Sequence, residues 1–365
     1  MSNSTPSVLR FNNSNKQFYT ELKKRVDSYF KDNNISKTGN LNMYIKTIFM
    51  LSAYLVPYFL LIFNVFDNKL VWLAFAVIMG MAMAGMGLCI MHDANHGSFS
   101  KNTKLNKFIG YVSLGLLGGY SLNWRIQHNV LHHTFTNVHN HDEDIDPPAF
   151  MRFEPHAQKR AIHKLQFIYA WVLYGLMTLM WSTTKDFQQL KRYHEKGLLK
   201  GANTTYEREL PILIVSKIGY FAYMLLPFIF VKNMSFLEWV AGYLVMHYFA
   251  GLVLAMIFQP AHVVESTEFP TPNEDGSLEN HWAIHQLKTT MNFATNDPVF
   301  TWLVGGLNHQ VEHHLFPTIC HVHYPKISKI VEQTAKEFDI PYLKKKTFLG
   351  ALRSHEIMLW RLGRV

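Results

Sequence analysis

Cysteine is scarce in this chain: only Cys89 and Cys320 occur among its 365 residues. Two cysteines form at most one bridge, so the disulfide framework that holds many small secreted domains together is excluded. We interpret both residues as thiols in apolar surroundings.

Acidic residues are outnumbered, because 26 Asp and Glu stand against 35 Lys and Arg, which gives a formal net charge of +9. In a membrane protein such an excess serves orientation and contact with anionic headgroups. It is therefore weak evidence for nucleic-acid binding, and we expect no nucleic-acid partner.

The N-terminal region lacks the apolar core and small-residue cleavage site of a secretory signal. We therefore expect it to be retained. Its polar and basic sequence predicts that residues 1–44 form a segment on the cytoplasmic side of a membrane.

The sequence does contain long apolar runs. Residues 48–66 and 71–91 contain no Lys, Arg, Asp or Glu, and each is long enough to cross the hydrocarbon core of a bilayer. Three later segments carry a charge or several polar groups and are weaker candidates: 165–184, 211–231 and 236–258.

Basic residues decide the topology. The stretch 185–210 holds six Lys or Arg, and basic loops stay in the cytoplasm. We therefore expect 165–184, like 104–122, to lie in the membrane interface without crossing. The predicted fold is an all-α integral membrane protein, in which residues 45–365 form one domain with a cytoplasmic helical cap. Its four transmembrane helices form two hairpins, at about 46–66, 71–91, 211–231 and 236–258.

Histidine is abundant, and position matters more than the total of twenty. Three clusters follow the apolar runs: MHDANH, RIQHNVLHH and NHQVEHH. Spacings of three or four residues place side chains on one face of a helix, and most spacings within the clusters are of this kind. The residues concerned are His92, His96, His128, His132, His133, Gln310, His313 and His314.

All three clusters fall on one predicted side of the membrane, so they can converge on one site. Neutral imidazole is a good ligand for Fe, Cu, Ni or Zn, and seven or eight ligands are too many for one ion. We therefore predict two metal ions. A single histidine in a membrane protein is more often an interfacial or hydrogen-bonding residue, but three clusters at helical spacing reverse that expectation.

The segments HDANH, HNVLHH and QVEHH resemble the three histidine boxes of the membrane fatty acid desaturases, and the glutamine of the third resembles the front-end subgroup. The resemblance extends from about residue 45 to about residue 345. It implies a non-haem di-iron enzyme that uses O2 and two electrons to place a double bond in an acyl chain. The front-end subgroup implies a chain that already carries a double bond.

The same resemblance implies the iron ligands. The family also takes a histidine from the end of its last transmembrane helix, and FQPAHVVE offers His262 there, with Gln-Pro in place of the Asn seen in the stearoyl-type branch. His309 is an alternative to Gln310 that spacing leaves open. The implied ligands are His92, His96, His128, His132, His133, His262, Gln310, His313 and His314.

Ligating histidines commonly donate their second N–H to a carboxylate or another acceptor, which fixes the tautomer. Asp93 also has ligand spacing with His96, but the resemblance places it behind the ligands. For the acidic run 142–146 a solvated loop is the alternative. The candidates for contact with the ligands from behind are Asp93, Glu312, Asp142, Asp146, His309 and His285.

The resemblance also implies partners: a fatty acyl-CoA or acyl-lipid substrate, the bilayer and an electron donor. Many front-end members carry a fused cytochrome b5-like domain with an HPGG motif, which this sequence lacks. We therefore expect a separate donor, a ferredoxin or a cytochrome b5 type with its reductase. Lys344, Lys345 and Lys346 are candidates for docking it, and lipid-headgroup contact is their alternative role.

Three other functions compete with desaturation. A hydroxylase or ketolase could use the same scaffold, although the QVEHH box argues against both. A b-type cytochrome would need facing histidines inside apolar helices, whereas these clusters flank the helices. A metal transporter is disfavoured because the apolar segments hold few ionisable groups.

Overall fold

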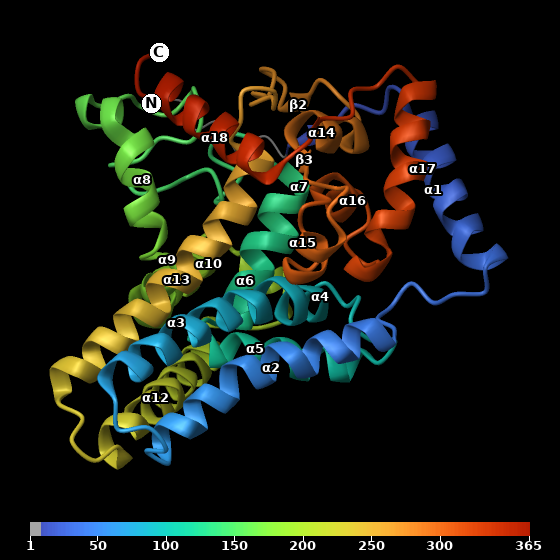
Figure 1. The fold of residues 1–365 in the computed structure, drawn as a ribbon. Helices are drawn as coiled ribbons and strands as arrows, with labels where there is room; N and C mark the ends of the chain where they lie inside the picture. Colours follow the sequence, from blue (N-terminus) through green and yellow to red (C-terminus); the bar gives the residue numbers. More distant parts are fainter. Residues whose placement is uncertain (1–8) are drawn as a thin grey trace.

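The computed structural model describes residues 9–365, and in this part of the chain nearly all regular structure is helical (Figure 1). Long helices fill one half of the molecule, and shorter elements form a cap over the other half. The predicted all-α fold with four helices long and apolar enough to cross a membrane is confirmed. These helices are α2 (Leu41–Ile62), α3 (Lys69–Met86, continuing through further helical turns to Asn95), α12 (Tyr206–Phe230) and α13 (Phe236–His262).

The helix ends differ from the predicted spans: all four begin at or before the predicted residue, but α2 stops at Ile62, short of the predicted 66. α2 begins five residues early because Asn40 caps it, its side chain accepting a hydrogen bond from the backbone N–H of Met43. The helical run of α3 and the end of α13 continue past the apolar residues to reach His92 and His262. Hydropathy marks only the apolar part of these helices, whereas the helical structure continues beyond it to the histidines.

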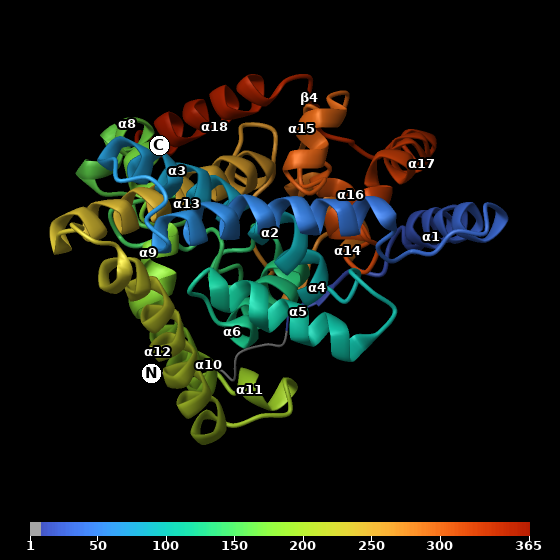
Figure 2. The same cartoon turned by 60° about the horizontal axis from the view of Figure 1, so that its bottom comes forward.

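Small residues set the close packing of the membrane helices. α3 packs against both α2 and α13. A Cβ at Gly80 would lie 2.4 Å from the carbonyl oxygen of Met246, and one at Gly85 would lie 2.5 Å from the sulfur of Met50. Glycine at these positions lets helix backbones approach, as is common between membrane helices. In Figure 2, α2 lies across the front of this packed group and α12 stands to one side.

Residues 165–184 do not form one straight helix. The helical run Ala161–Tyr174 meets the run Met177–Glu195 at an angle of 64°. Lys217 of α12 holds the second run, because its ammonium group donates to the carbonyl oxygen of Trp181 at 2.6 Å and to Asp186 at 2.5 Å. The place of this bent pair in the interface remains a prediction. Its elements are η3 (Ala161–Leu165), α8 (Gln166–Tyr174), α9 (Met177–Met180), η4 (Trp181–Lys185) and α10 (Asp186–Glu195), with α11 (Leu198–Gly201) following.

The predicted segment 104–122 is α5 (Thr103–Leu116), which ends before Gly118. Gly118 has a φ of +76°, and a Cβ there would lie 2.8 Å from the Cβ of Ser182. Glycine allows both the left-handed turn and the close approach. The chain then enters α6 (Ser121–Arg125), which leads to the second histidine cluster.

The cap combines both ends of the described chain. α1 (Lys16–Asp32) packs on α17 through a buried apolar face, and Arg25 forms an ion pair with Glu337 at 2.7 Å. The described part of segment 1–44 is therefore built into the cap (Figures 1 and 2). The other cap helices are α14 (Trp282–Thr289), α15 (Pro298–Leu303), α16 (Gln310–Leu315), η5 (His321–His323), α17 (Tyr324–Glu337) and α18 (Phe348–Leu362).

Two short strand pairs fasten this cap. β1 (Arg10–Phe11) pairs in parallel with β2 (Ser277–Leu278), and β3 (Asn292–Phe293) pairs in parallel with β4 (Lys344–Lys345). Each pair joins segments that are distant in sequence and lie beside α14 and α15 (Figure 1). The pairs thereby fix the loops on either side of the third histidine cluster.

Candidate metal centre

The first histidine cluster stands on the inner end of the α3 run. The helix widens into the π-helical segment η1 (Gly87–Met91) and continues as α4 (His92–Asn95). His92 is buried, and its ring lies 4.7 Å from that of His96 between centroids. The predicted four-residue spacing thus places both imidazoles on one side.

The second cluster lies on another π-helical segment, η2 (Ile126–His132), followed by α7 (His133–Phe135). An α-helix brings residues four apart onto one face, whereas the wider π turn brings residues five apart together. The Nε2 atoms of His128 and His133 accordingly lie 3.2 Å apart. His132 turns toward the other side of the centre, where it meets His262.

The third cluster is α16, a buried helix of six residues. Its adjacent His313 and His314 point to different neighbours: the ring of His313 lies 4.4 Å from that of His92, and the ring of His314 lies 4.7 Å from that of His262. His262 is the last residue of α13. One helix therefore contributes to two parts of the centre.

All eight predicted histidines converge. The donor atoms within each of three groups lie within 4.8 Å of one another, and the groups share His313 and His314. The sharing joins the groups into one continuous centre. The groups are His92, His96, His128 and His313; His132, His262 and His314; and His133, His313 and His314.

The donor atoms fit a metal centre better than a hydrogen-bonded cluster. The Nε2 atoms of His128, His133 and His313 lie 2.9, 3.2 and 3.4 Å apart. A ring nitrogen of neutral imidazole either donates or accepts, so among three mutually close nitrogens at least two have the same role and repel. Nitrogens bound to one ion at about 2.1 Å lie about 3.0–3.4 Å apart, which is the spacing here.

Buried nitrogens without a partner support the same conclusion. Within the described residues, several box histidines have a ring nitrogen that is buried and forms no hydrogen bond. Leaving a buried polar atom unpaired costs about 1–3 kcal/mol. Bound metal ions would satisfy the Nε2 atoms of this set, which face the other histidines. The nitrogens are Nδ1 of His92 and His133 and Nε2 of His96, His262 and His314.

The opposite ring nitrogens of several ligands are held from behind. His132 Nδ1 lies 3.0 Å from both oxygens of Asp142, and His314 Nδ1 lies 2.8 Å from Oε1 of Gln286. His262 Nδ1 lies 3.2 Å from the carbonyl oxygen of Thr289. With the Nδ1 proton donated outward, Nε2 keeps its lone pair for the centre of the cluster.

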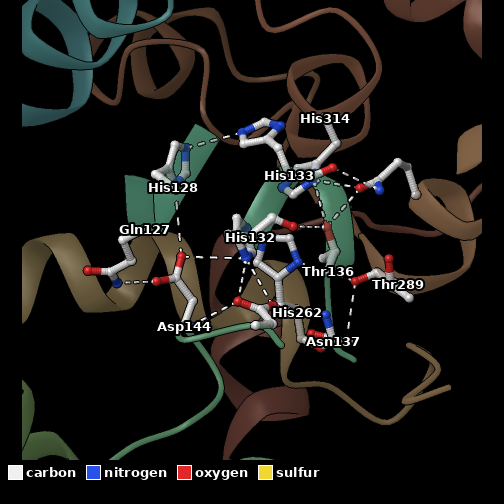
Figure 3. A network of polar contacts seen from close by, with 12 residues as sticks. Gln127, His128, His132, His133, Thr136, Asn137, Asp144, His262, Thr289 and His314 are labelled. Atoms are coloured by element: carbon white, nitrogen blue, oxygen red, sulfur yellow. Dashed lines mark hydrogen bonds and ion pairs between the residues drawn. The ribbon is translucent and has the colours of Figure 1, made fainter. Parts of the chain in front are cut away.

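Asp144 reaches the same region from the loop after the second cluster. Its Oδ2 lies 3.5 Å from Nδ1 of His132 and 3.8 Å from Nδ1 of His128, and Gln127 donates to its other oxygen. Figure 3 shows Asp144 between the two histidines, with His262 beside His132. The acidic run is therefore part of the centre at Asp142 and Asp144.

Burial keeps most of the predicted histidine ligands uncharged by lowering their pKa. It lowers the pKa of His133, His313 and His314 well below the ordinary value, and the neighbouring imidazoles lower it further. His132 differs, because the carboxylates of Asp142 and Asp144 outweigh burial and raise its pKa to about 9. Most of the cluster is thus neutral and ready to bind a cation.

Comparison with known proteins agrees with this geometry. The family described as fatty acid desaturase matches residues 70–346. The chain belongs to the fatty acid desaturase family. It is 41% identical over 96% of its length to the acyl-lipid (8-3)-desaturase of Physcomitrium patens, of which 72% is covered.

Two cyanobacterial relatives match over nearly their whole length. The chain is 35% identical to the sn-1 linoleoyl-lipid 6-desaturase of Arthrospira platensis, over 95% of this chain and 92% of the relative. It is 34% identical to the enzyme of the same name from Synechocystis, over 95% of this chain and 96% of the relative. The protein is accordingly a fatty acid desaturase, an oxidoreductase of lipid metabolism.

In the third box of this desaturase, Gln310 and His309 are alternative candidates for one metal-ligand position. Gln310 and His309 are both buried, and each has side-chain nitrogen without a hydrogen-bond partner among the described residues. His309 lies 3.6 Å from Glu312 and belongs to none of the three histidine groups within residues 9–365. Its position counts against it as a ligand.

Asp93 and Glu312 were predicted to contact the histidine ligands from behind, and both have other partners. Asp93 lies against the first box but bonds to Cys320 and His321. Glu312 accepts hydrogen bonds from Asn292 and Tyr342, both at 2.8 Å, and thereby holds α16.

His285 and Asp146 do not contact the ligands as expected. His285 Nε2 lies 2.8 Å from the carbonyl oxygen of Thr136, so it acts on the loop after the second box. Asp146 is exposed, and the structure gives its side chain no contact with a box histidine. Ile145 packs inward among apolar residues, and the adjacent Asp146 therefore faces solvent. The prediction for Asp146 was wrong.

Several residues of the centre were missed. Gln286 and Thr136 both contact His314 Nδ1, and the hydroxyl of Tyr324 lies 3.2 Å from Nδ1 of His313. Asn137, with a φ of +59°, donates to the carbonyl oxygen of His262 at 3.0 Å (Figure 3). Only the left-handed tolerance of asparagine in HHTFTN could have indicated such a turn.

Proposed function

We propose that this desaturase uses two iron ions and O2 to introduce a cis double bond into an acyl chain that already carries one. The observation that carries the proposal is the inward orientation of the Nε2 atoms. Eight histidines, all buried except the partly exposed His96, surround one centre, and the opposite nitrogens of three of them are held by Asp142, Gln286 and the carbonyl oxygen of Thr289.

Two ions are supported by the grouping of the donors. One group of four donors includes His128 and His313, and a separate group of three includes His132 and His314. His133 lies between them. Imidazole alone would also suit zinc, copper or nickel, so the choice of iron rests on family membership. Removing hydrogen from an unactivated methylene needs the redox chemistry that bound iron and O2 supply.

The protein's own contribution is orientation and exclusion of water. Trp124 lies 5.6 Å from the ring of His92 and 4.4 Å from that of His128, and Phe258 lies 6.3 Å from both rings. These side chains give the centre an apolar wall against which a methylene chain would pack. Asp142 holds the Nδ1 proton of His132, which keeps Nε2 directed inward.

The substrate and partners follow from the relatives. The relatives named above are called acyl-lipid or linoleoyl-lipid desaturases, so we infer an acyl group carried on a lipid, with the new bond between an existing bond and the carboxyl end. A separate protein of the ferredoxin or cytochrome b5 type delivers the electrons. The active site faces the cytoplasm, supported by the basic stretch 185–210.

Expression in a desaturase-deficient host fed linoleic acid tests the proposal. We expect a new fatty acid with one more double bond, absent from the His313→Ala variant although that variant still inserts into the membrane. A hydroxylated product in its place would favour the hydroxylase alternative. Retained product in His313→Ala would contradict the role of His313.

A further inference from the structure

A second group of buried polar side chains lies beside the first box, and the reaction described above gives it no role. It joins Lys46 of α2, Asp93 of α4, His321 of η5 and Cys320, the residue before η5. All four are at most 2% exposed. An ammonium group and a carboxylate buried in this way are each costly unless they are paired and hydrogen-bonded.

His321 connects the two charges. Its Nε2 lies 2.7 Å from the Nζ of Lys46, and its Nδ1 lies 2.9 Å from Oδ2 of Asp93. An ammonium group only donates, so Nε2 accepts and Nδ1 carries the proton that is donated to Asp93. Burial and the adjacent Lys46 lower the pKa of His321 to about 4, so the ring is neutral as this chain requires.

The same carboxylate oxygen of Asp93 accepts two further hydrogen bonds. Cys320 donates through its thiol at 2.9 Å and His321 through its backbone N–H at 3.3 Å, both to Oδ2. Several box histidines have unpaired nitrogens, whereas both ring nitrogens of His321 and Oδ2 of Asp93 are hydrogen-bonded. We therefore interpret the group as a hydrogen-bonded link, although Asp93, Cys320 and His321 lie close enough to hold an ion.

Asp93 and His321, two members of this link, are each joined through the chain to a predicted ligand from a different box. Asp93 directly follows His92, and its backbone carbonyl accepts from the N–H of Ser98 at 2.9 Å, which closes the turn after His96. On the other side, His321 leads into Tyr324, whose hydroxyl lies 3.2 Å from Nδ1 of His313.

We propose that Lys46 is a positioning residue of the metal centre: through His321 and Asp93 it locks the first box against the third, so that His92 and His313 face the same ion. The inference rests on the metal centre proposed above. The rings of His92 and His313 lie 4.4 Å apart. Loss of the lock would let α4 and the segment after α16 separate.

Replacing the lysine tests the lock through metal retention, without substrate. The Lys46→Met and wild-type proteins are loaded with Fe(II) without oxygen, and the rate of iron release to a chelator is measured. We expect release roughly 10–100-fold faster in Lys46→Met, the usual range for loss of a group behind a ligand. Lys37→Met is the matched control, because that lysine is 44% exposed in a surface ion pair with Asp27.

If the Lys46→Met protein does not accumulate, two variants of His321 test the same positioning role. His321→Asn keeps a side-chain N–H donor near Asp93, whereas His321→Ala keeps only the backbone N–H. We expect slow iron release in His321→Asn and fast release in His321→Ala. A role in stability alone would lower the unfolding temperature of both and leave release from the folded protein unchanged.

The outcomes separate the two proposals. A wild-type protein that retains iron, with variants that release it at the same rate, would overturn the positioning role and leave the metal centre standing. A wild-type protein that binds no iron or other divalent metal would overturn the centre itself, and the lock with it.

Discussion

Metal binding should displace a proton from His132. The carboxylates of Asp142 and Asp144 raise its pKa to about 9, so in the metal-free protein this ring is protonated at pH 7. A metal needs the neutral ring. The gap of about two pKa units corresponds to about 3 kcal/mol, or roughly a hundredfold in affinity at pH 7.

Replacing Asp142 by Asn makes this competition measurable. Calorimetric titration with Zn(II), a redox-inert stand-in, in buffers of different ionisation enthalpy gives the number of protons released on binding. We expect the wild type to release about one proton more at pH 7 than Asp142→Asn, because removal of the carboxylate lowers the pKa of His132. Asp146→Asn, in the same loop but exposed, should match the wild type. Equal release in all three proteins would refute the reasoning.

The same pKa fixes how the stability of the metal-free protein depends on pH. The folded-state pKa of His132 lies above the value of about 6.5 expected in the unfolded chain. Its contribution to stability is therefore complete below about pH 6.5 and is lost as the pH rises through about 9. Chemical denaturation at pH 6 and pH 9.5 measures it, and the difference should shrink in Asp142→Asn.

Three further predictions concern the framework and its surface. Lys217→Met should lower the free energy of unfolding by about 3–5 kcal/mol, because Asp186 is left as an unpaired buried charge; denaturant titration would show it, and an unchanged midpoint would contradict it. Gly118→Ala should lower the unfolding temperature through its clash with Ser182; an unchanged or higher temperature would disprove the clash. His194→Ala should keep product yield within about twofold, since His194 is exposed; an inactive, inserted variant would show that the site is misplaced.

The sequence was sufficient to predict the spans and the convergence of the boxes, because both depend on local patterns. A run such as 71–91 has no alternative to a helix in lipid, and histidine spacing is visible without any fold. The ends of the spans could not be predicted, since α13 continues as a helix beyond its apolar run to reach His262.

Contacts behind the ligands could not be predicted for a different reason. The spacing of five between His128 and His133 suits a π turn, but such a turn is too rare to be expected from spacing alone. Gln286 and Tyr324 come from the neighbouring helices α14 and α17, outside the box they contact, and Lys46 reaches His321 from α2. Their roles depend on how the cap folds over the membrane helices, which no local pattern encodes.

The wide separation of the boxes along the chain has a consequence for biosynthesis. The first box is complete at residue 96, but its partners His313 and His314 follow more than two hundred residues later. Both helical hairpins can therefore enter the membrane during translation while the centre is still open. Because α16 is made so late and then closes a long loop, we expect the histidine cluster to be completed only after membrane insertion, and a chain truncated before α16 would lack His313 and His314.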